Sequence, residues 1–238
     1  MNISVVIPAF NEERRLGDTL EEIREFMELN GYEYKVIVVD DGSTDDTVRV
    51  AGVSRLAKAS RLELLSNERN RGKGYSVRKG LEQADGDLVL ITAADLSTPI
   101  KDFHKLSGAV NEGFDVAIGS RSIPGSDVQV SQPFYRVRMG KVFNLFVRTF
   151  VMGGLIDTQC GFKLIRKECL RDIVGHMRLE GFSYDVEMLY IARKKGYRVK
   201  EVPVTWRDSA GSKVDPLKDP VRMFSDLLNI KKKHRNLQ

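Results

Sequence analysis

The chain has 238 residues, which is enough to bury one sizeable hydrophobic core, and we expect a single domain. Hydrophobic residues make up 42% and charged residues 30%, a balance that argues against an intrinsically disordered chain and for an ordinary globular protein. The net charge of +5 is unevenly spread, because basic residues cluster at 69–73 and in the KKKHR tail, and such patches suit phosphate groups, anionic lipid or nucleic acid.

Short β-branched runs in the first half of the chain alternate with segments of helical periodicity. The runs are ISVVIP, YKVIVVD, LELLS and DLVLIT, and a later one is DVAIGSR. This alternation predicts an α/β fold with a mostly parallel central sheet flanked by helices. Ligands bind such a sheet at the carboxyl ends of its strands, where the sequence places PAFNEE, DDGSTDDT and TAADLSTP.

The most apolar part of the chain runs from residue 134 to about residue 156. A membrane span needs about 20 mostly apolar residues, whereas this segment is interrupted by Arg136, Arg138, Lys141 and Arg148. On a helix the last three of these would share one side. The other side would carry Val142, Phe143, Phe146, Val147 and Phe150. The pattern is typical of a helix in a membrane interface or of an amphipathic core helix, and both interpretations stay open.

The polar strand ends offer what a nucleotide diphosphate sugar needs. Asp40 and Asp41 are acceptors for a base and a ribose, and Asp95 alone can be enough for Mg²⁺ or Mn²⁺, since Mg²⁺ typically takes one or two protein carboxylates plus phosphate oxygens and water. Lys73 lies between two glycines before a predicted helix. The glycines let the backbone approach an anion and the start of the helix adds free N–H donors, so the segment suits a phosphate; a basic helix entry is the alternative. The RDSAGSK loop offers further phosphate contacts through Arg207, Ser212 and Lys213. Turn and helix-capping chemistry alone would also explain the acidic segments.

The segment GFSYDVEMLYIARKKG predicts a helix with two acidic residues near its start, and RVKEVPVTW predicts a strand after it. Asp185 or Glu187 can deprotonate an acceptor hydroxyl. Only one of them should point towards the polar strand ends where ligands are expected, because helix residues two apart do not share a face. A phosphate monoester acceptor has a second pKa of about 6 and needs no base. Asp185 would then orient the acceptor or the sugar. An acidic first turn that favours the helix dipole is the alternative.

Eight motifs, in this order along the chain, resemble the inverting glycosyltransferases of family 2, which have the GT-A fold. They are VVIPAFNEE, VVDDGSTDDT, NRGKG, ADLSTP, AIGSR, DTQCGFKL, FSYDVEMLYIA and GSK. The resemblance implies a single GT-A domain over 1–238, with a nucleotide-sugar binding half at 1–121 and an acceptor-binding half at 122–238. The chain is most similar to members that transfer glucose from UDP-glucose to dolichyl or another polyprenyl phosphate.

The resemblance also implies roles for individual residues. A nucleotide pocket would be lined by Pro8, Ala9, Asn11 and Glu12. Asp40 would contact the uridine, and Asp41 would also bind the donor. Lys73 would bind the base or the phosphates. Ala94 and Asp95 would contact the donor, and Asp95 would match the second aspartate of the family's Asp-x-Asp metal motif. The residues facing the donor sugar or the acceptor phosphate would be Arg121, Gln159 and Asp185. Those closing over the diphosphate would be Arg207, Ser212 and Lys213.

Position 93 departs from the family pattern, because Ala93 stands where the first aspartate of the metal motif is expected. Either this branch of the family tolerates the loss or the residue was changed deliberately, and the otherwise intact motifs favour the second explanation. Three alternatives to a polyprenyl-phosphate glucosyltransferase stay open. They are a GDP-mannose-dependent dolichyl-phosphate mannosyltransferase, a nucleotide-sugar binding module that lost catalysis with the aspartate, and a glucosyltransferase with a soluble acceptor.

The sequence also lacks the membrane-spanning segment that some relatives carry. The amphipathic region at 134–156 and the basic tail would then dock a peripheral protein at the cytoplasmic face of a membrane. We expect no signal peptide, and Cys160 and Cys169, which lack metal-site spacing, favour a reducing compartment. No nucleic-acid partner is expected, because the sequence shows neither an aromatic-basic array nor a reading helix.

Overall fold

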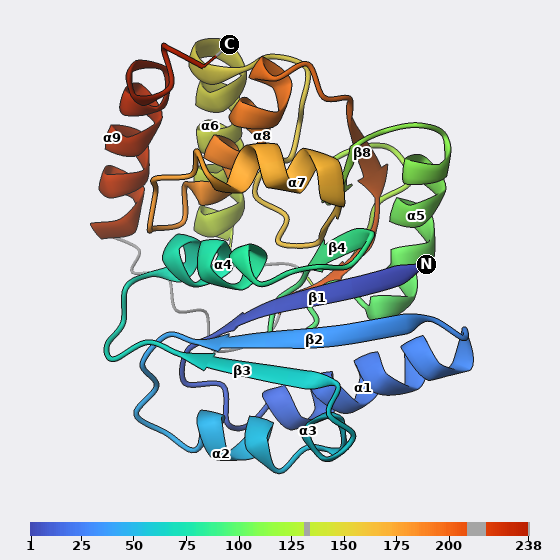
Figure 1. The fold of residues 1–238 in the computed structure, drawn as a ribbon. Coiled ribbons are helices and arrows are strands. Elements are labelled where there is room, and N and C mark those ends of the chain that lie inside the picture. The colour runs from blue at the N-terminus through green and yellow to red at the C-terminus, as the bar shows by residue number, and fades with distance from the viewer. Residues whose placement is uncertain (131–133, 209–217, 238) are drawn as a thin grey trace.

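A seven-stranded sheet forms the centre of the fold (Figure 1), which a computed structural model describes for residues 1–130, 134–208 and 218–237. The strands, in the order β3-β2-β1-β4-β7-β5-β8, are β3 (Leu62–Ser66), β2 (Glu33–Asp40), β1 (Asn2–Ala9), β4 (Leu88–Ile91), β7 (Lys163–Arg166), β5 (Val116–Ser120) and β8 (Val199–Pro203). Every neighbouring pair is parallel except the two pairs that β7 makes. The predicted mostly parallel α/β sheet is therefore confirmed.

Two hydrophobic clusters lie on opposite faces of the sheet, because the central strands β1, β2, β4 and β5 are apolar on both faces. One cluster is covered by α1 (Leu16–Leu29), α2 (Thr47–Gly52), α3 (Arg55–Lys58) and α5 (Phe103–Asn111), which the short helix η1 (Ile100–Asp102) precedes. The other is covered by α4 (Lys73–Glu82), α6 (Phe134–Phe146), η2 (Val147–Val151), α7 (Lys167–Val174), α8 (Tyr184–Lys194) and α9 (Lys218–Lys233). The helix expected from YDVEML is α8.

The antiparallel strand β7 was not predicted, because four residues with charged ends show no alternation. It lies between β4 and β5, and Lys163 at its start pairs with Ile91 on one side and Ile118 on the other. Because β7 runs against its neighbours, its start lies at the same edge of the sheet as their carboxyl ends. The DTQCG loop is thereby brought to the edge where ligands of such sheets bind.

The segment expected as one strand, RVKEVPVTW, is divided between two sheets. β8 ends at Pro203, and β9 (Thr205–Arg207) pairs instead with β6 (Asp127–Val130) in a small second sheet. The amide of Thr205 donates to Asp102 Oδ2 at 2.6 Å, and the amide of Arg207 donates to the Ser97 carbonyl at 2.9 Å. These bonds draw the chain away from the main sheet and towards the segment that follows β4.

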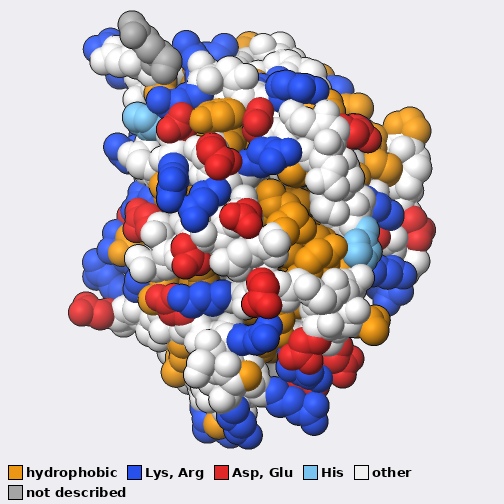
Figure 2. Space-filling view, turned by 45° about the vertical axis from the view of Figure 1, so that its right-hand side comes forward, with side chains coloured by type: hydrophobic (Ala, Val, Ile, Leu, Met, Phe, Trp, Pro, Cys, Tyr) orange, Lys and Arg blue, Asp and Glu red, His pale blue; other side chains and the backbone are white. Residues whose placement is uncertain are grey.

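The helices α6 and α9 lie side by side at the upper left of Figure 1, and the rings of Phe146 and Phe224 meet edge to face with centroids 5.2 Å apart. In the part of the chain that the structure describes, no helix is both long enough and apolar enough to cross a membrane. On the face shown in Figure 2, basic and acidic side chains are interspersed with small apolar patches. The excess positive charge therefore does not form one continuous basic surface on that face.

Candidate active site

The loops after β1 and β2 are fastened to each other at the carboxyl edge of the sheet. Asn11 has a positive φ of 53°, its amide donates to Ser43 Oγ at 2.9 Å, and its side-chain oxygen accepts from the Thr44 amide at 2.8 Å. Pro8 and Ala9 end β1, and Ala9 pairs with Asp40 at the end of β2. The residues expected to line a nucleotide pocket are thus adjacent at one edge.

The two consecutive aspartates after β2 have different surroundings. Among the described residues, both carboxylate oxygens of Asp40 share a single donor, the Ser43 amide, at 3.2 and 3.3 Å. Asp41 accepts from Asn67 Nδ2 at 2.8 Å and from the amides of Arg71 and Gly72 at 2.9 and 2.8 Å. Asp41 therefore orders the 67–72 loop, whereas Asp40 keeps acceptor capacity for a ligand.

The start of α4 differs from the sequence-based interpretation. The expected free N–H groups are occupied, because the Glu180 carbonyl accepts from the amides of Gly74 and Tyr75 at 2.8 and 3.2 Å. A Cβ at Gly72 would lie 2.4 Å from that same carbonyl oxygen, so this glycine allows backbone packing and not the approach of an anion. No described residue forms a hydrogen bond or ion pair with the Lys73 ammonium, and a Cβ at Gly161 would lie 3.6 Å from its Nζ. Lys73 therefore reaches the DTQCG loop.

The segment that carries Asp95 is a tight turn beside β1. Asp95 Oδ1 accepts from the Ser97 amide at 3.0 Å, and Asp95 Oδ2 lies 3.7 Å from Nη1 of Arg15, which also pairs with Glu12 at 2.5 Å. The Ala94 carbonyl accepts from the buried Thr19 hydroxyl at 2.8 Å, which fixes the turn. Asp95 is 21% exposed, so a ligand can reach its outer oxygen.

Residues that could hold a divalent metal are few. Over the described ranges 1–130, 134–208 and 218–237, no group of three His, Cys, Asp or Glu side chains is arranged to hold a metal ion. Ala93, beside the sheet edge, supplies no ligand atom, so Asp95 Oδ2 is the remaining carboxylate oxygen of the motif. This fits a cation that takes most of its ligands from a bound diphosphate and water.

The small second sheet places Arg207 beside the Asp95 turn, through the bond of its amide to the Ser97 carbonyl. The Arg207 guanidinium donates from Nε to Gln129 Oε1 at 2.6 Å. Ser212 and Lys213, expected to close over the diphosphate, lie outside the described residues.

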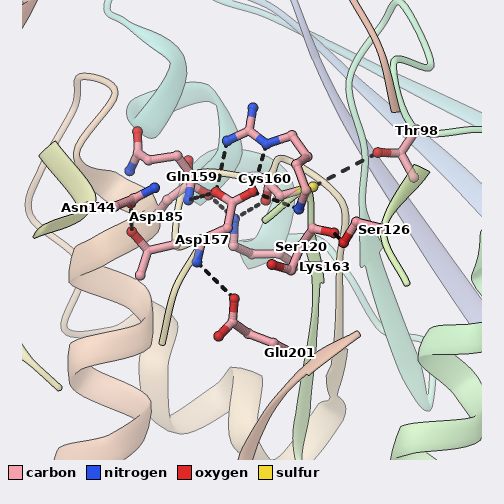
Figure 3. A network of polar contacts seen from close by, with 12 residues as sticks. Thr98, Ser120, Ser126, Asn144, Asp157, Gln159, Cys160, Lys163, Asp185 and Glu201 are labelled. Atoms are coloured by element: carbon pink, nitrogen blue, oxygen red, sulfur yellow. Dashed lines mark hydrogen bonds and ion pairs between the residues drawn. The ribbon is translucent and has the colours of Figure 1, made fainter. Parts of the chain in front are cut away.

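An ion pair between the partly exposed Arg121 and the fully buried carboxylate of Asp157 joins the end of β5 to the DTQCG loop (Figure 3). Arg121 donates from Nε and Nη2 to the two carboxylate oxygens of Asp157 at 2.7 and 2.8 Å, and the Arg121 amide donates to Oδ2 at 3.0 Å. Burial alone would raise the pKa of Asp157, but the charge and hydrogen bonds of Arg121 lower it below its usual value. Among the described residues Nη1 of Arg121 has no hydrogen-bond partner, and the guanidinium carbon lies 5.4 Å from the Trp206 ring.

The same loop carries Gln159, whose Nε2 is buried and has no hydrogen-bond partner among the described residues. Below the loop, the fully buried Lys163 ammonium donates to the carbonyl of Cys160 and forms an ion pair with Asp185 Oδ1. Burial, and then the charge of Asp185, raises the pKa of Tyr184 well above its usual value, so this phenol stays neutral. The side-chain amide of Gln159, the guanidinium of Arg121 and the carboxylate of Asp185 thus all lie at or next to the DTQCG loop.

The two acidic residues of α8 point to different neighbours, as helix geometry predicts. Asp185 pairs with Lys163, whereas the carboxylate of Glu187 accepts from the amides of Arg178 and Leu179 at 2.9 and 2.8 Å and contacts His234 Nε2 at 2.8 Å. Glu187 therefore anchors α9 and the segment before α8. Lys163 and Asp157 were not singled out as site residues from the sequence; a lysine inside the apolar run CGFKLI was the available signal for Lys163.

The strand order, the helices on both faces and the polar carboxyl edge define a nucleotide-diphospho-sugar transferase of the GT-A fold. Residues 4–174 match the profile of Glycosyl transferase family 2, and the chain belongs to this family of enzymes. Similar proteins include the dolichyl-phosphate beta-glucosyltransferase of Drosophila melanogaster, 36% identical over 97% of this chain and 74% of that protein. Those of Dictyostelium discoideum and Homo sapiens are 34% and 32% identical over 96% of this chain, and over 73% and 74% of their own lengths.

A solved structure with the same fold is glucosyl-3-phosphoglycerate synthase from Mycobacterium tuberculosis, in complex with Mn²⁺, UDP-glucose and phosphoglyceric acid. The TM-score is 0.73, and the match covers 96% of this chain and 79% of that chain with 21% sequence identity. At this identity the likeness shows the fold alone.

Proposed function

We propose that this enzyme transfers glucose from UDP-glucose to dolichyl or another polyprenyl phosphate, with inversion at the anomeric carbon, giving the β-glucosyl phosphate lipid and UDP. The observation that carries this proposal is the likeness to dolichyl-phosphate beta-glucosyltransferases at 32–36% identity over 96–97% of the chain. In this proposal 1–121 is the donor-binding half and 122–238 the acceptor-binding half of one domain.

The donor would bind across the loops after β1, β2 and β4. Pro8, Ala9, Asn11 and Glu12 would line the nucleotide, and the available oxygens of Asp40 would accept from the uracil or the ribose. Lys73 and Arg207 would contact the diphosphate from two sides, with Ser212 and Lys213. Positive charge placed there stabilises the departing UDP without rearrangement during the reaction.

The acceptor phosphate would bind at the DTQCG loop, against Nη1 of Arg121, which no described residue occupies, and the buried amide of Gln159. One phosphate oxygen attacks the anomeric carbon as the bond between that carbon and the UDP oxygen breaks, and the electron pair leaves with UDP. The attacking phosphate is already ionised at neutral pH, so no base is needed. Asp185, held by Lys163, would orient the sugar or the acceptor.

A divalent cation, Mg²⁺ or Mn²⁺, would be held by Asp95 and by the donor's own phosphates. When bound, it would neutralise charge that develops on the leaving diphosphate. A single protein carboxylate suffices for Mg²⁺, but a second one at position 93 would add attraction for the dication.

Restoring the carboxylate at position 93 should therefore strengthen donor binding. We expect Ala93→Asp to bind UDP-glucose about tenfold more tightly than the parent chain in the presence of Mn²⁺, and no more tightly than the parent in EDTA, where the added carboxylate repels the diphosphate. Titration calorimetry of both proteins, with GDP-mannose as the alternative donor, measures this. Equal affinity of the two proteins with Mn²⁺ would contradict the assignment of Asp95 to the metal.

Donor binding without transfer in either protein would favour the alternative of a nucleotide-sugar binding module. Selective binding of GDP-mannose would favour the alternative mannosyltransferase.

The lipid acceptor implies contact with a membrane, and α6 with α9 provides a surface for it. The expected division of the 134–156 region into two faces holds only in part, because Phe143 of α6 and Val147 of η2 are buried in the core while Val142 and Phe150 are 58% and 55% exposed. We call the exposed apolar side chains the apolar ridge, consisting of Met139, Val142, Leu145, Phe150, Ile156 and Leu228. Exposed basic residues flank it at Arg138, Lys141 and Arg148, and Lys231, Lys232 and Lys233 end α9.

Apolar side chains bordered by basic ones fit the interface of an anionic bilayer, where the former enter the acyl boundary and the latter meet head groups. The ridge also reaches the candidate site. Ile156 adjoins Asp157, and Asn144 on α6 accepts a hydrogen bond from the Thr158 hydroxyl at 3.2 Å. We propose that the protein docks peripherally in this orientation, at the cytoplasmic face of a membrane, so that the lipid phosphate reaches Arg121.

Removing the ridge should weaken membrane binding. We expect the triple variant Val142→Ser, Leu145→Ser, Phe150→Ser to lower the partition onto vesicles of anionic phospholipid at least about tenfold, because three exposed apolar side chains no longer enter the bilayer. Co-sedimentation measures the bound fraction. The matched control is Leu29→Ser with Val53→Ser, two exposed apolar residues elsewhere that should leave binding unchanged. Equal sedimentation of the triple variant and the parent would refute the docking surface.

A further inference from the structure

Glu201, on strand β8, makes an interaction that the proposed reaction has not yet used. Its carboxylate accepts from the amide of Ile156 at 2.7 Å through Oε2. It also accepts from the amide of Asp157 at 2.8 Å through Oε1 (Figure 3). Within the described ranges it has no Lys, Arg or His partner at ion-pair distance. Both oxygens of this side chain are thus directed at two consecutive backbone amides of one loop.

The loop residue that Glu201 holds is the partner of Arg121. Asp157 is 1% exposed, and its carboxylate receives Nε, Nη2 and the backbone amide of Arg121, together with the amide of Gln159 at 3.2 Å. Every polar contact that orients the Arg121 guanidinium among the described residues therefore passes through Asp157. A shift of the Asp157 backbone would therefore move Nη1 of Arg121, the atom that we propose binds the acceptor phosphate.

The other hydrogen bonds that hold the DTQCG loop involve residues after Asp157. Thr158 bonds to Asn144, and the Cys160 carbonyl accepts from Lys163. Neither of these acts on residues 156 and 157, where the backbone amides are held by Glu201 alone among the described residues. The strand β8 is in turn fixed by its parallel pairing with β5, the strand that Arg121 follows. Glu201 thus links Asp157 to β8, and the pairing of β8 with β5 links it to the strand that precedes Arg121.

We propose that Glu201 is a positioning residue, which sets the orientation of Arg121 towards the acceptor phosphate by holding the backbone of Asp157. The part that concerns the acceptor rests on the proposed function. Charge-assisted bonds to backbone amides are strong and directional, and a guanidinium displaced by about 1 Å binds an anion far less well.

Glu201→Gln tests this with little change of shape, because the amide keeps one acceptor oxygen and loses the other. We expect the KM for polyprenyl phosphate to rise about tenfold, while the calorimetric affinity for UDP and the Tm change little. Glu201→Asp tests whether the length of the side chain matters in addition to its charge. It keeps the carboxylate but shortens it by one methylene, so it should behave like Glu201→Gln. Lys200→Ala, an exposed neighbour on the same strand, is the matched control and should match the parent.

A second readout decides the inference even if glucose transfer to a polyprenyl phosphate is not observed. Phenylglyoxal modifies arginine side chains, and its rate at Arg121, followed by peptide mass spectrometry, reports how firmly the guanidinium is held. We expect this rate to rise at least about fivefold in Glu201→Gln and Glu201→Asp, and not in Lys200→Ala. An unchanged rate at Arg121, or an acceptor KM that Glu201→Gln leaves unchanged in an active enzyme, would overturn the proposal.

Discussion

Replacing Arg121 with methionine is expected to lower the rate of glucose transfer by at least about 100-fold and to destabilise the protein by about 3–5 kcal/mol. The rate falls because the acceptor phosphate loses the cation that we propose binds it. The stability falls because the fully buried carboxylate of Asp157 is left without its partner. Chemical denaturation and steady-state kinetics measure the two effects. As the control, Arg55→Met removes an arginine that is 71% exposed and pairs with Glu21, and it should cost at most about 1 kcal/mol.

The pH dependence of this stability loss follows from the pKa of Asp157. In the parent protein this pKa lies below the unfolded value of about 3.9, so the carboxylate contributes stability above pH 4 that is lost as the pH falls through the folded pKa. In Arg121→Met, burial acts without the arginine and raises the pKa of Asp157 above the unfolded value. The difference in unfolding free energy between parent and variant should therefore be largest at neutral pH, begin to shrink above pH 4 as Asp157 of the variant is protonated, and go on shrinking down to the lower pKa of the parent. A pH-independent difference would contradict the assigned pair.

Replacing Lys163 with methionine should also cost about 3–5 kcal/mol of stability, because Asp185, with a side chain 6% exposed, becomes an uncompensated buried charge. The double variant Lys163→Met, Asp185→Asn removes both charges and should recover part of that loss, which denaturation of the single and double variants measures. Lys194→Met, an exposed lysine on the same helix as Asp185, should stay within about 0.5 kcal/mol of the parent. Equal stabilities of Lys163→Met and Lys194→Met would refute a structural ion pair.

The parallel part of the sheet could be predicted from sequence because its strands are local apolar runs separated by helical periods. The runs that became β1, β2, β3, β4 and β5 carry that pattern in full. β7 could not be found in this way, since its pairing with β4 and β5 depends on residues far away in the chain. The split between β8 and β9 likewise depends on Asp102, whose carboxylate accepts the Thr205 amide across 103 positions.

The candidate site, too, has a part that local sequence predicts and a part that depends on contacts between distant residues. The turns that carry Asn11, Asp40 and Asp95 were placed at one sheet edge by their position after strands. The side chains that hold the site were not all foreseen, because Lys163 and Glu201 act through contacts that no spacing rule encodes. The glycines around Lys73 were assigned to anion binding, whereas their small size serves the packing of residues 179–181 against α4.

The measurement that tests the proposed reaction most directly is transfer of labelled glucose from UDP-glucose to a polyprenyl phosphate by the purified chain with Mn²⁺ in detergent. We expect a lipid product whose anomeric configuration is β by NMR, no product from GDP-mannose, and a loss of product in Arg121→Met but not in Arg55→Met. Product formed only from GDP-mannose, an α-linked glucosyl lipid, or transfer to small hydroxyl acceptors without any lipid phosphate would contradict the account.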